Sequence, residues 1–166
     1  AGCDMAVENY TLSPSQTRDE FAHANAISPL PNGDIYISFR RLNMIALIDR
    51  TTRKLKWQHR DDSFGMQHDC EPLANGNVTL FANGTNITTN PFSRVVEIDP
   101  RTHKTVWEYR GKPSYTFFSP HISGAQRLVS GNTLICEGQW GRLFEVTPDG
   151  DIVWEYVSPF MGPDRL

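Results

Sequence analysis

The sequence lacks several features that would each indicate a particular class of protein. No apolar run approaches the roughly 18 to 20 residues that a membrane-spanning helix needs. Acidic and basic residues are interspersed and the net charge is -3, so no basic surface indicates nucleic acid or an anionic membrane as a partner. The cysteines, Cys3, Cys70 and Cys136, show no CxxC spacing. Neither a disulfide framework nor a zinc site is therefore predicted, although a single disulfide stays open.

The composition that is present is that of a folded domain. Hydrophobic residues make up 39% of the 166 residues and charged residues 21%, which predicts one compact globular unit. Four Asn-x-Ser/Thr sequons begin at Asn9, Asn77, Asn83 and Asn86. Most of them lie in turn-rich sequence, where Asn, Gly and Thr are favoured for backbone reasons, so the sequons do not by themselves predict glycosylation.

One short pattern occurs three times along the chain. The copies are LPNGDIYI, LANGNVTL and LVSGNTLI, at residues 30–37, 73–80 and 128–135. In each copy an Asn-Gly or Ser-Gly pair stands before an alternating apolar run, and the pair can supply the positive φ angles of a tight turn. Each copy therefore predicts a β-hairpin.

Each hairpin is followed by two further predicted strands. The third strand is an apolar run at residues 45–49, 95–99 and 143–147, and the fourth carries a tryptophan seven or eight residues later, at Trp57, Trp107 or Trp154. Four short antiparallel strands per repeat, with no helical periodicity, are typical of a β-propeller blade. We predict an all-β fold with three blades, near residues 23–62, 66–110 and 117–160, after an N-terminal arm or linker at residues 1–22. The three tryptophans are predicted to pack between blades.

Three blades do not close a propeller, because typical rings hold four to eight. A lone half-ring would expose two blade faces, and soluble monomers rarely show so large an apolar surface. The sequence therefore predicts half of a six-bladed ring. The ring would be completed either by self-association or by blades missing from this sequence.

A histidine stands eight to ten residues before each turn glycine, namely His23, His68 and His121. This spacing places all three on innermost strands, facing one central channel. Convergent imidazoles suit a metal ion, or nucleophilic and acid–base chemistry on an anion. Arginines nearby, Arg40 and Arg94 among them, favour the anion, because a guanidinium binds sulfate-like oxygens and repels a cation. The alternative is that each histidine only fixes the register of its blade.

One further aromatic residue departs from the repeat. Trp140 lies in a predicted glycine-flanked loop between the second and third strands of the last blade. It would either line an aromatic acceptor site or anchor its loop.

Several stretches resemble the bacterial arylsulfate sulfotransferases and their uncharacterised propeller relatives. They are residues 23–27, 67–69, 93–98 and above all 117–147, and the resemblance covers about residues 21–160. It implies a six-bladed propeller, periplasmic or secreted, that moves a sulfuryl group from a phenolic sulfate to a phenol without a nucleotide donor or other cofactor. It implies small aromatic sulfates and phenols as partners.

The resemblance also implies roles for single residues. One channel histidine would be transiently sulfated, and we predict His121 for this role. His23 and His68 would bind sulfate or move protons, and Arg94 would neutralise the sulfate oxygens. Arg40, Asn25 and Trp140 complete the predicted substrate-binding residues. The main alternative is a non-catalytic propeller module that serves assembly or binds an anion or metal.

Overall fold

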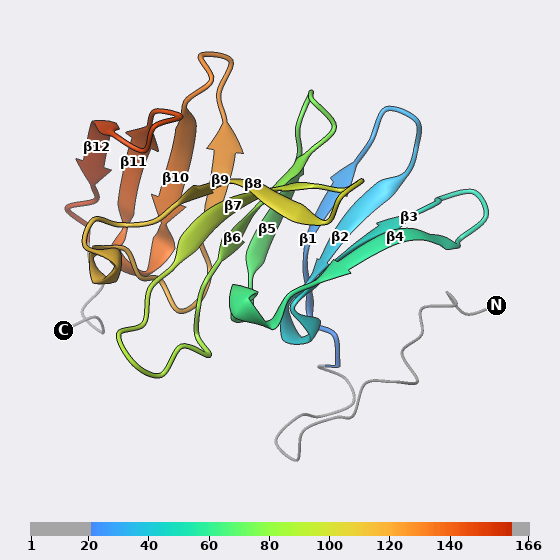
Figure 1. Cartoon of the computed structure of the whole chain (residues 1–166), viewed down its shortest axis with the longest axis horizontal. Coiled ribbons are helices and arrows are strands. Elements are labelled where there is room, and N and C mark those ends of the chain that lie inside the picture. Colours follow the sequence, from blue (N-terminus) through green and yellow to red (C-terminus); the bar gives the residue numbers. More distant parts are fainter. Residues whose placement is uncertain (1–20, 161–166) are drawn as a thin grey trace.

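The structure, a computed structural model, describes residues 21–160 and shows an all-β chain. The predicted arm, residues 1–22, lies outside the described residues except for its last two. Three antiparallel four-stranded sheets follow one another along the chain, which confirms the predicted fold class. In Figure 1 the sheets stand side by side, with β9, β5 and β1 toward the middle of the assembly.

Each sheet is one blade whose strands occur in sequence order. Blade 1 consists of β1 (Ala24–Pro29), β2 (Ile35–Phe39), β3 (Met44–Ile48) and β4 (Leu55–Arg60). Blade 2 consists of β5 (His68–Pro72), β6 (Val78–Ala82), β7 (Arg94–Asp99) and β8 (Lys104–Tyr109). Blade 3 consists of β9 (Gly124–Arg127), β10 (Thr133–Glu137), β11 (Arg142–Val146) and β12 (Ile152–Val157).

The first turn of every blade has the same geometry. The amide of each turn glycine donates to the carbonyl of the leucine three residues earlier, at 2.9 Å in all three blades. Only the glycines, Gly33, Gly76 and Gly131, have positive φ, between 87° and 90°, whereas the preceding Asn or Ser does not. The turns are therefore type I turns followed by a left-handed glycine rather than two-residue turns with two positive φ angles. The side chain of the preceding residue accepts from the amide two positions on, as in Asn32 with Asp34 at 3.0 Å.

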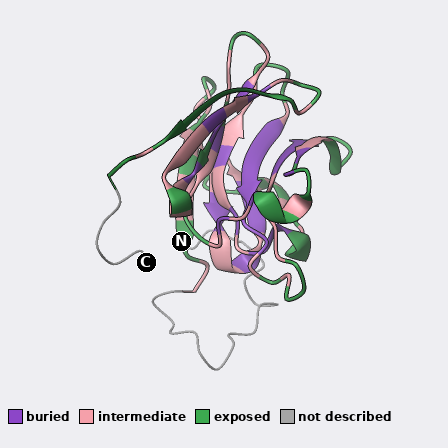
Figure 2. Ribbon diagram, turned by 90° about the vertical axis from the view of Figure 1, so that its left-hand side faces the viewer, coloured by how far each residue is buried: buried purple, intermediate pink, exposed green. Residues whose placement is uncertain are grey.

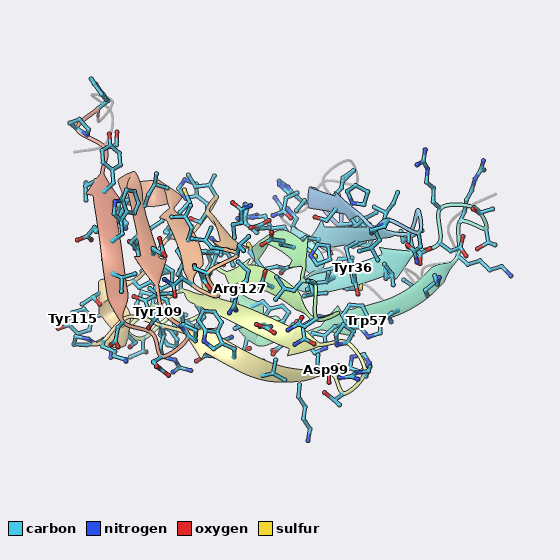
Figure 3. The ribbon with its side chains drawn as sticks, turned by 90° about the horizontal axis from the view of Figure 1, so that it is seen from above. Tyr36, Trp57, Asp99, Tyr109, Tyr115 and Arg127 are labelled. Atoms are coloured by element: carbon cyan, nitrogen blue, oxygen red, sulfur yellow. The ribbon has the colours of Figure 1, made fainter. Side chains whose placement is uncertain are left out.

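Tryptophans from two blades bond to the next blade. Nε1 of Trp57 donates to the Pro100 carbonyl of blade 2 at 2.8 Å, and Nε1 of Trp107 donates to the Pro148 carbonyl of blade 3 at 2.7 Å. Figure 3 shows Trp57 beside the blade 2 turn that carries Asp99. A β-bulge follows the tryptophan's partner in all three blades, so the tryptophan sits at the same place in each sheet.

Two of the hydrophobic clusters lie between blades, and a third, Phe39, Leu42, Met44 and Ala46, lies on the outer face of blade 1. Between blades 1 and 2, Tyr36 and Ile45 pack with Phe64 and with strands β5 to β7. Between blades 2 and 3, Phe117 lies 5.4 Å from the Phe81 ring and 5.5 Å from the Phe144 ring. Figure 2 shows the buried residues gathered in the middle strands of the sheets, β6 and β7 above all, while the strand that leads to the C terminus is exposed.

Within residues 21–160, helical structure is limited to single 3-10 turns. They are η3 (Arg40–Leu42), η4 (Asp62–Phe64), η5 (Ser114–Thr116) and η6 (Gly138–Trp140). Trp140 thus ends a 3-10 turn where the sequence predicted a loop. None of the helices within residues 21–160 is long and apolar enough to cross a membrane.

Candidate functional site

The innermost strands β1, β5 and β9, called here the axial strands, are joined by polar contacts. From β1, Nδ2 of Asn25 donates to the Gln67 carbonyl at 2.9 Å, just before β5. From β5, the Asp69 carboxylate accepts from the amide of Ala125 in β9 at 2.8 Å. Glu71 accepts from the Arg127 amide at 3.1 Å. Side-chain hydrogen bonds thus connect the axial strands of the three blades, which belong to separate sheets and do not pair with one another.

His68 is the most firmly held of the three predicted channel histidines. It begins β5, is half-buried, and its Nδ1 lies 2.9 Å from Oδ1 of Asn83. Asn83 is fully buried in the long β6–β7 loop, and its Nδ2 donates to the carbonyls of Ser119 at 2.8 Å and Ile122 at 3.0 Å.

The two carbonyls fix the protonation of the imidazole. A carbonyl only accepts, so it must face the NH₂ group of Asn83, and this leaves the amide oxygen toward His68. Nδ1 of His68 must therefore carry the proton and donate. In the neutral ring Nε2 then holds a lone pair, which is the arrangement that a nucleophile or general base needs.

The structure brings His68 together with three of the predicted residues. Burial lowers the pKa of His68 below its ordinary value, and the hydrogen bond to Asn83 opposes this effect. The positive charges of Arg40, His23 and His121 lower the pKa further, in that order. Each of these three residues therefore lies near enough to His68 for its charge to act on the imidazole.

His121 and His23 are held less tightly than His68. Both side chains are exposed, and Arg40 donates its amide to the His23 carbonyl at 3.0 Å. The backbone after His121 has positive φ at Ile122 and Ser123, 52° and 89°. Ser119 fixes that loop by donating from its Oγ to the His121 carbonyl at 3.0 Å. The loop backbone is thus set while the His121 ring stays at the surface.

Asn25 adds a hydrogen-bond acceptor to the axial strands. While its Nδ2 reaches blade 2, its Oδ1 is buried and has no hydrogen-bond partner among the described residues. A buried acceptor without a partner is costly, so this oxygen is suited to a donor on a ligand or on a protonated histidine.

Two predicted site residues, Arg94 and Trp140, make their hydrogen bonds with residues other than the histidines. Arg94, at the start of β7, pairs with Glu108 at 2.9 Å and donates to Ser63 Oγ at 2.9 Å. Trp140 is half-exposed, and its Nε1 donates to the Phe118 carbonyl at 2.7 Å. The sulfate-binding role of Arg94 and the acceptor role of Trp140 stay predictions.

Sequence reasoning missed Asn83, Asp69 and Glu71 as members of this edge. Asn83 was visible only as a sequon, yet its side chain is fully buried and hydrogen-bonded within the fold. Burial raises the pKa of Glu71, although its hydrogen bond with the Arg127 amide opposes the shift. The repeat did not indicate Glu71 as a site residue, because the axial strands of the three blades differ in sequence at this position.

A hollow of about 350 Å³ lies beside the axial strands, toward blade 3. It is lined by Ser28, Asp69, Glu71, Gly124, Ala125, Gln126, Leu134, Cys136 and Leu143. Within residues 21–160, no three His, Cys, Asp or Glu side chains are arranged to hold a metal ion.

Comparison with protein families gives one match, which spans most of the chain. Residues 7–159 match the family model described as arylsulfotransferase (ASST). No sequence among curated proteins matches this chain significantly.

Several solved structures share the fold. A protein of unknown function from Bacteroides caccae has a TM-score of 0.61 at 15% identity over 81% of this chain and 45% of its own. Virginiamycin B lyase from Staphylococcus aureus gives 0.59 at 18% identity over 84% and 42%. The WD40 beta-propeller domain of Doa1 gives 0.58 at 14% identity over 83% and 40%. At such identities the likeness shows the propeller fold alone, and the aligned region spans less than half of each of these chains.

Proposed function

The chain belongs to the arylsulfotransferase family, and on that premise we propose that it moves a sulfuryl group from a phenolic sulfate ester to a phenol, with His68 as the residue that carries the group between them. The observation that supports His68 is its fixed tautomer. Asn83 holds the Nδ1 proton and leaves Nε2 with a lone pair, beside the charge of Arg40. The sequence had favoured His121, but the structure shows no comparable partner for the exposed His121 ring within the described residues.

The proposed reaction has two balanced steps. First, Nε2 of His68 attacks the sulfur, an N–S bond forms and the S–O bond to the aryl group breaks. The leaving phenolate takes a proton from His121 or His23. Second, the oxygen of the acceptor phenol attacks the same sulfur, the N–S bond breaks, and the phenol proton passes to the neutral His121 or His23. Each step is a transfer of SO₃ without oxidation or reduction.

Arg40 is the cation that we propose for the sulfate oxygens. Its charge is among those that lower the pKa of His68, so it acts on the proposed nucleophile. A guanidinium offers fixed donors to three developing negative oxygens, and sulfuryl transfer, like phosphoryl transfer, depends on positioning and charge more than on covalent machinery. By the family resemblance we also propose a periplasmic or secreted location.

The test measures transfer from para-nitrophenyl sulfate to phenol. The rate is read from the release of para-nitrophenolate. We expect turnover by the native sequence and loss of about a thousandfold or more in His68→Ala. His103→Ala is the matched control, because His103 is an exposed histidine on the outer turn of blade 2 and should leave the rate unchanged. A His68→Ala protein that folds normally and keeps the native rate would contradict the proposal.

A further inference from the structure

The outward face of blade 3 repeats a face that is buried in blade 2. In blade 2, Phe81, Val95 and Tyr109 form one cross-strand row, and blade 3 covers it, leaving Tyr109 only 5% exposed. The matching row in blade 3 is Cys136, Leu143 and Tyr156, and there Tyr156 is 44% exposed. A second row, Leu134, Glu145 and Trp154, lies on the same face. These six residues are called here the bare face.

The bare face also holds a hydrogen-bond donor without its acceptor. Trp57 and Trp107 each donate to a carbonyl in the turn between the third and fourth strands of the next blade. Trp154 occupies the same position in blade 3 and has no such partner within residues 21–160, and it is 48% exposed.

The matching acceptor lies at the other end of the chain. Pro100 is the first residue after β7 and Pro148 the second after β11, and their carbonyls accept from the tryptophans. Arg50 stands near the same point after β3 of blade 1, is exposed, and its carbonyl accepts no hydrogen bond within the described part of the chain.

The blade 1 face around that acceptor is apolar. Ile37 and Ile48 are only partly buried there, whereas Phe39, Met44 and Ala46 on the same face are buried in a cluster against which Phe21 and Ala22 pack. The counterparts of Ile37 and Ile48 in blade 2, Leu80 and Ile98, are fully buried against blade 1. One end of the chain therefore presents the donor half of the inter-blade contact, and the other end presents the acceptor half.

We propose that a second copy of this chain docks head to tail, so that Trp154 of each copy donates to the Arg50 carbonyl of the other. Two such contacts related by a twofold axis close a ring of six blades. The partner's axial strand β1 would then lie beside β9 and close the hollow between Glu71 and Leu143. This inference does not rest on sulfuryl transfer.

The experiment is sedimentation of the full chain from roughly micromolar to hundred-micromolar concentration. We expect a monomer–dimer equilibrium, weakened about 30-fold or more in Trp154→Ala, the effect of truncating an interfacial tryptophan. Val129→Ser is the matched control, because Val129 is fully exposed at the β9–β10 turn, away from the bare face, and should leave the equilibrium unchanged. Arg50→Pro should dimerise like the native chain, because the proposed acceptor is a main-chain carbonyl. The matching acceptor in blade 2 is itself the carbonyl of a proline, Pro100.

A second measurement locates the contact. Cys136 is an exposed thiol on the bare face, whereas Cys70 is buried. Peptide mapping after alkylation should show Cys136 protected at dimeric concentrations and reactive on dilution or in Trp154→Ala. A monomer throughout the range, or a dimer in which Trp154→Ala has the native affinity and Cys136 stays reactive, would overturn the proposal. Neither result would bear on transfer, which is measured separately through His68.

Discussion

Blade 2 and blade 3 share one repeat pattern but have very different surroundings. Blade 2 is covered on both faces, and its histidine, His68, is oriented by the buried Asn83. Blade 3 is covered on one face, and its histidine, His121, lies at the surface. The difference teaches that equivalent positions in a repeat share geometry without sharing chemistry, because the neighbours decide burial and hydrogen bonding.

The largest expected effect concerns the two faces of blade 3. Phe144 is fully buried against blade 2, so Phe144→Ala should lower the free energy of unfolding by about 3 to 5 kcal/mol, through lost burial and the cavity left behind. Tyr156→Ala, on the bare face, should cost about 1 kcal/mol in dilute solution, because Tyr156 is 44% exposed and loses less burial than Phe144. Urea denaturation measures both. Equal losses of unfolding free energy would contradict the difference in burial between the two faces of blade 3.

The second effect separates the two histidines. His68→Gln should reduce transfer from an aryl sulfate by about a thousandfold, because it removes the group proposed to attack sulfur. His121→Gln should reduce it by about ten- to a hundredfold, the size expected for one of two alternative proton donors. Steady-state kinetics with para-nitrophenyl sulfate measure both. The reverse order would assign the sulfated role to blade 3, as the sequence alone had favoured.

A smaller effect separates the two tryptophans. Trp107→Phe removes the hydrogen bond to the Pro148 carbonyl but keeps an aromatic ring, and should cost about 1 kcal/mol of unfolding free energy. Trp154→Phe should cost nothing in the monomer, because its Nε1 has no partner within residues 21–160. The same denaturation experiment at low concentration gives the comparison. A measurable loss in Trp154→Phe would mean that blade 3 already holds an acceptor.

The smallest effect is on pH dependence. Burial lowers the pKa of His68, so the folded state favours the neutral ring. The stability that this contributes is fully present above the ordinary pKa of about 6.5 and is lost as pH falls through the lower value of the folded state. His68→Gln should flatten the decline in stability between neutral and mildly acidic pH. A residual slope should remain from His59, whose pKa is lowered by burial and then by His103. An unchanged slope would contradict the half-buried, neutral His68.

The repeat made much of the fold predictable, because hairpin turns and strand alternation are local signals. The turn glycines and the tryptophans of the fourth strands fall where the sequence placed them. The site was less predictable, because its organisation comes from a segment that does not repeat. Asn83 belongs to the long β6–β7 connection, whereas the matching connections in blades 1 and 3 are the short 3-10 turns η3 and η6. Arg94 resembled an anion ligand in sequence, but its partner Glu108 lies 14 residues away and is brought to it only by the sheet.

The most direct measurement of the central proposal is to map the sulfated residue. The chain is incubated with para-nitrophenyl sulfate without an acceptor, quenched in alkali, digested and analysed by mass spectrometry. The proposal predicts one added SO₃ on the peptide that contains His68, removed when phenol is supplied and absent from His68→Gln. A folded protein that releases para-nitrophenolate while His68 stays unmodified, or that carries the group on His121, would contradict it.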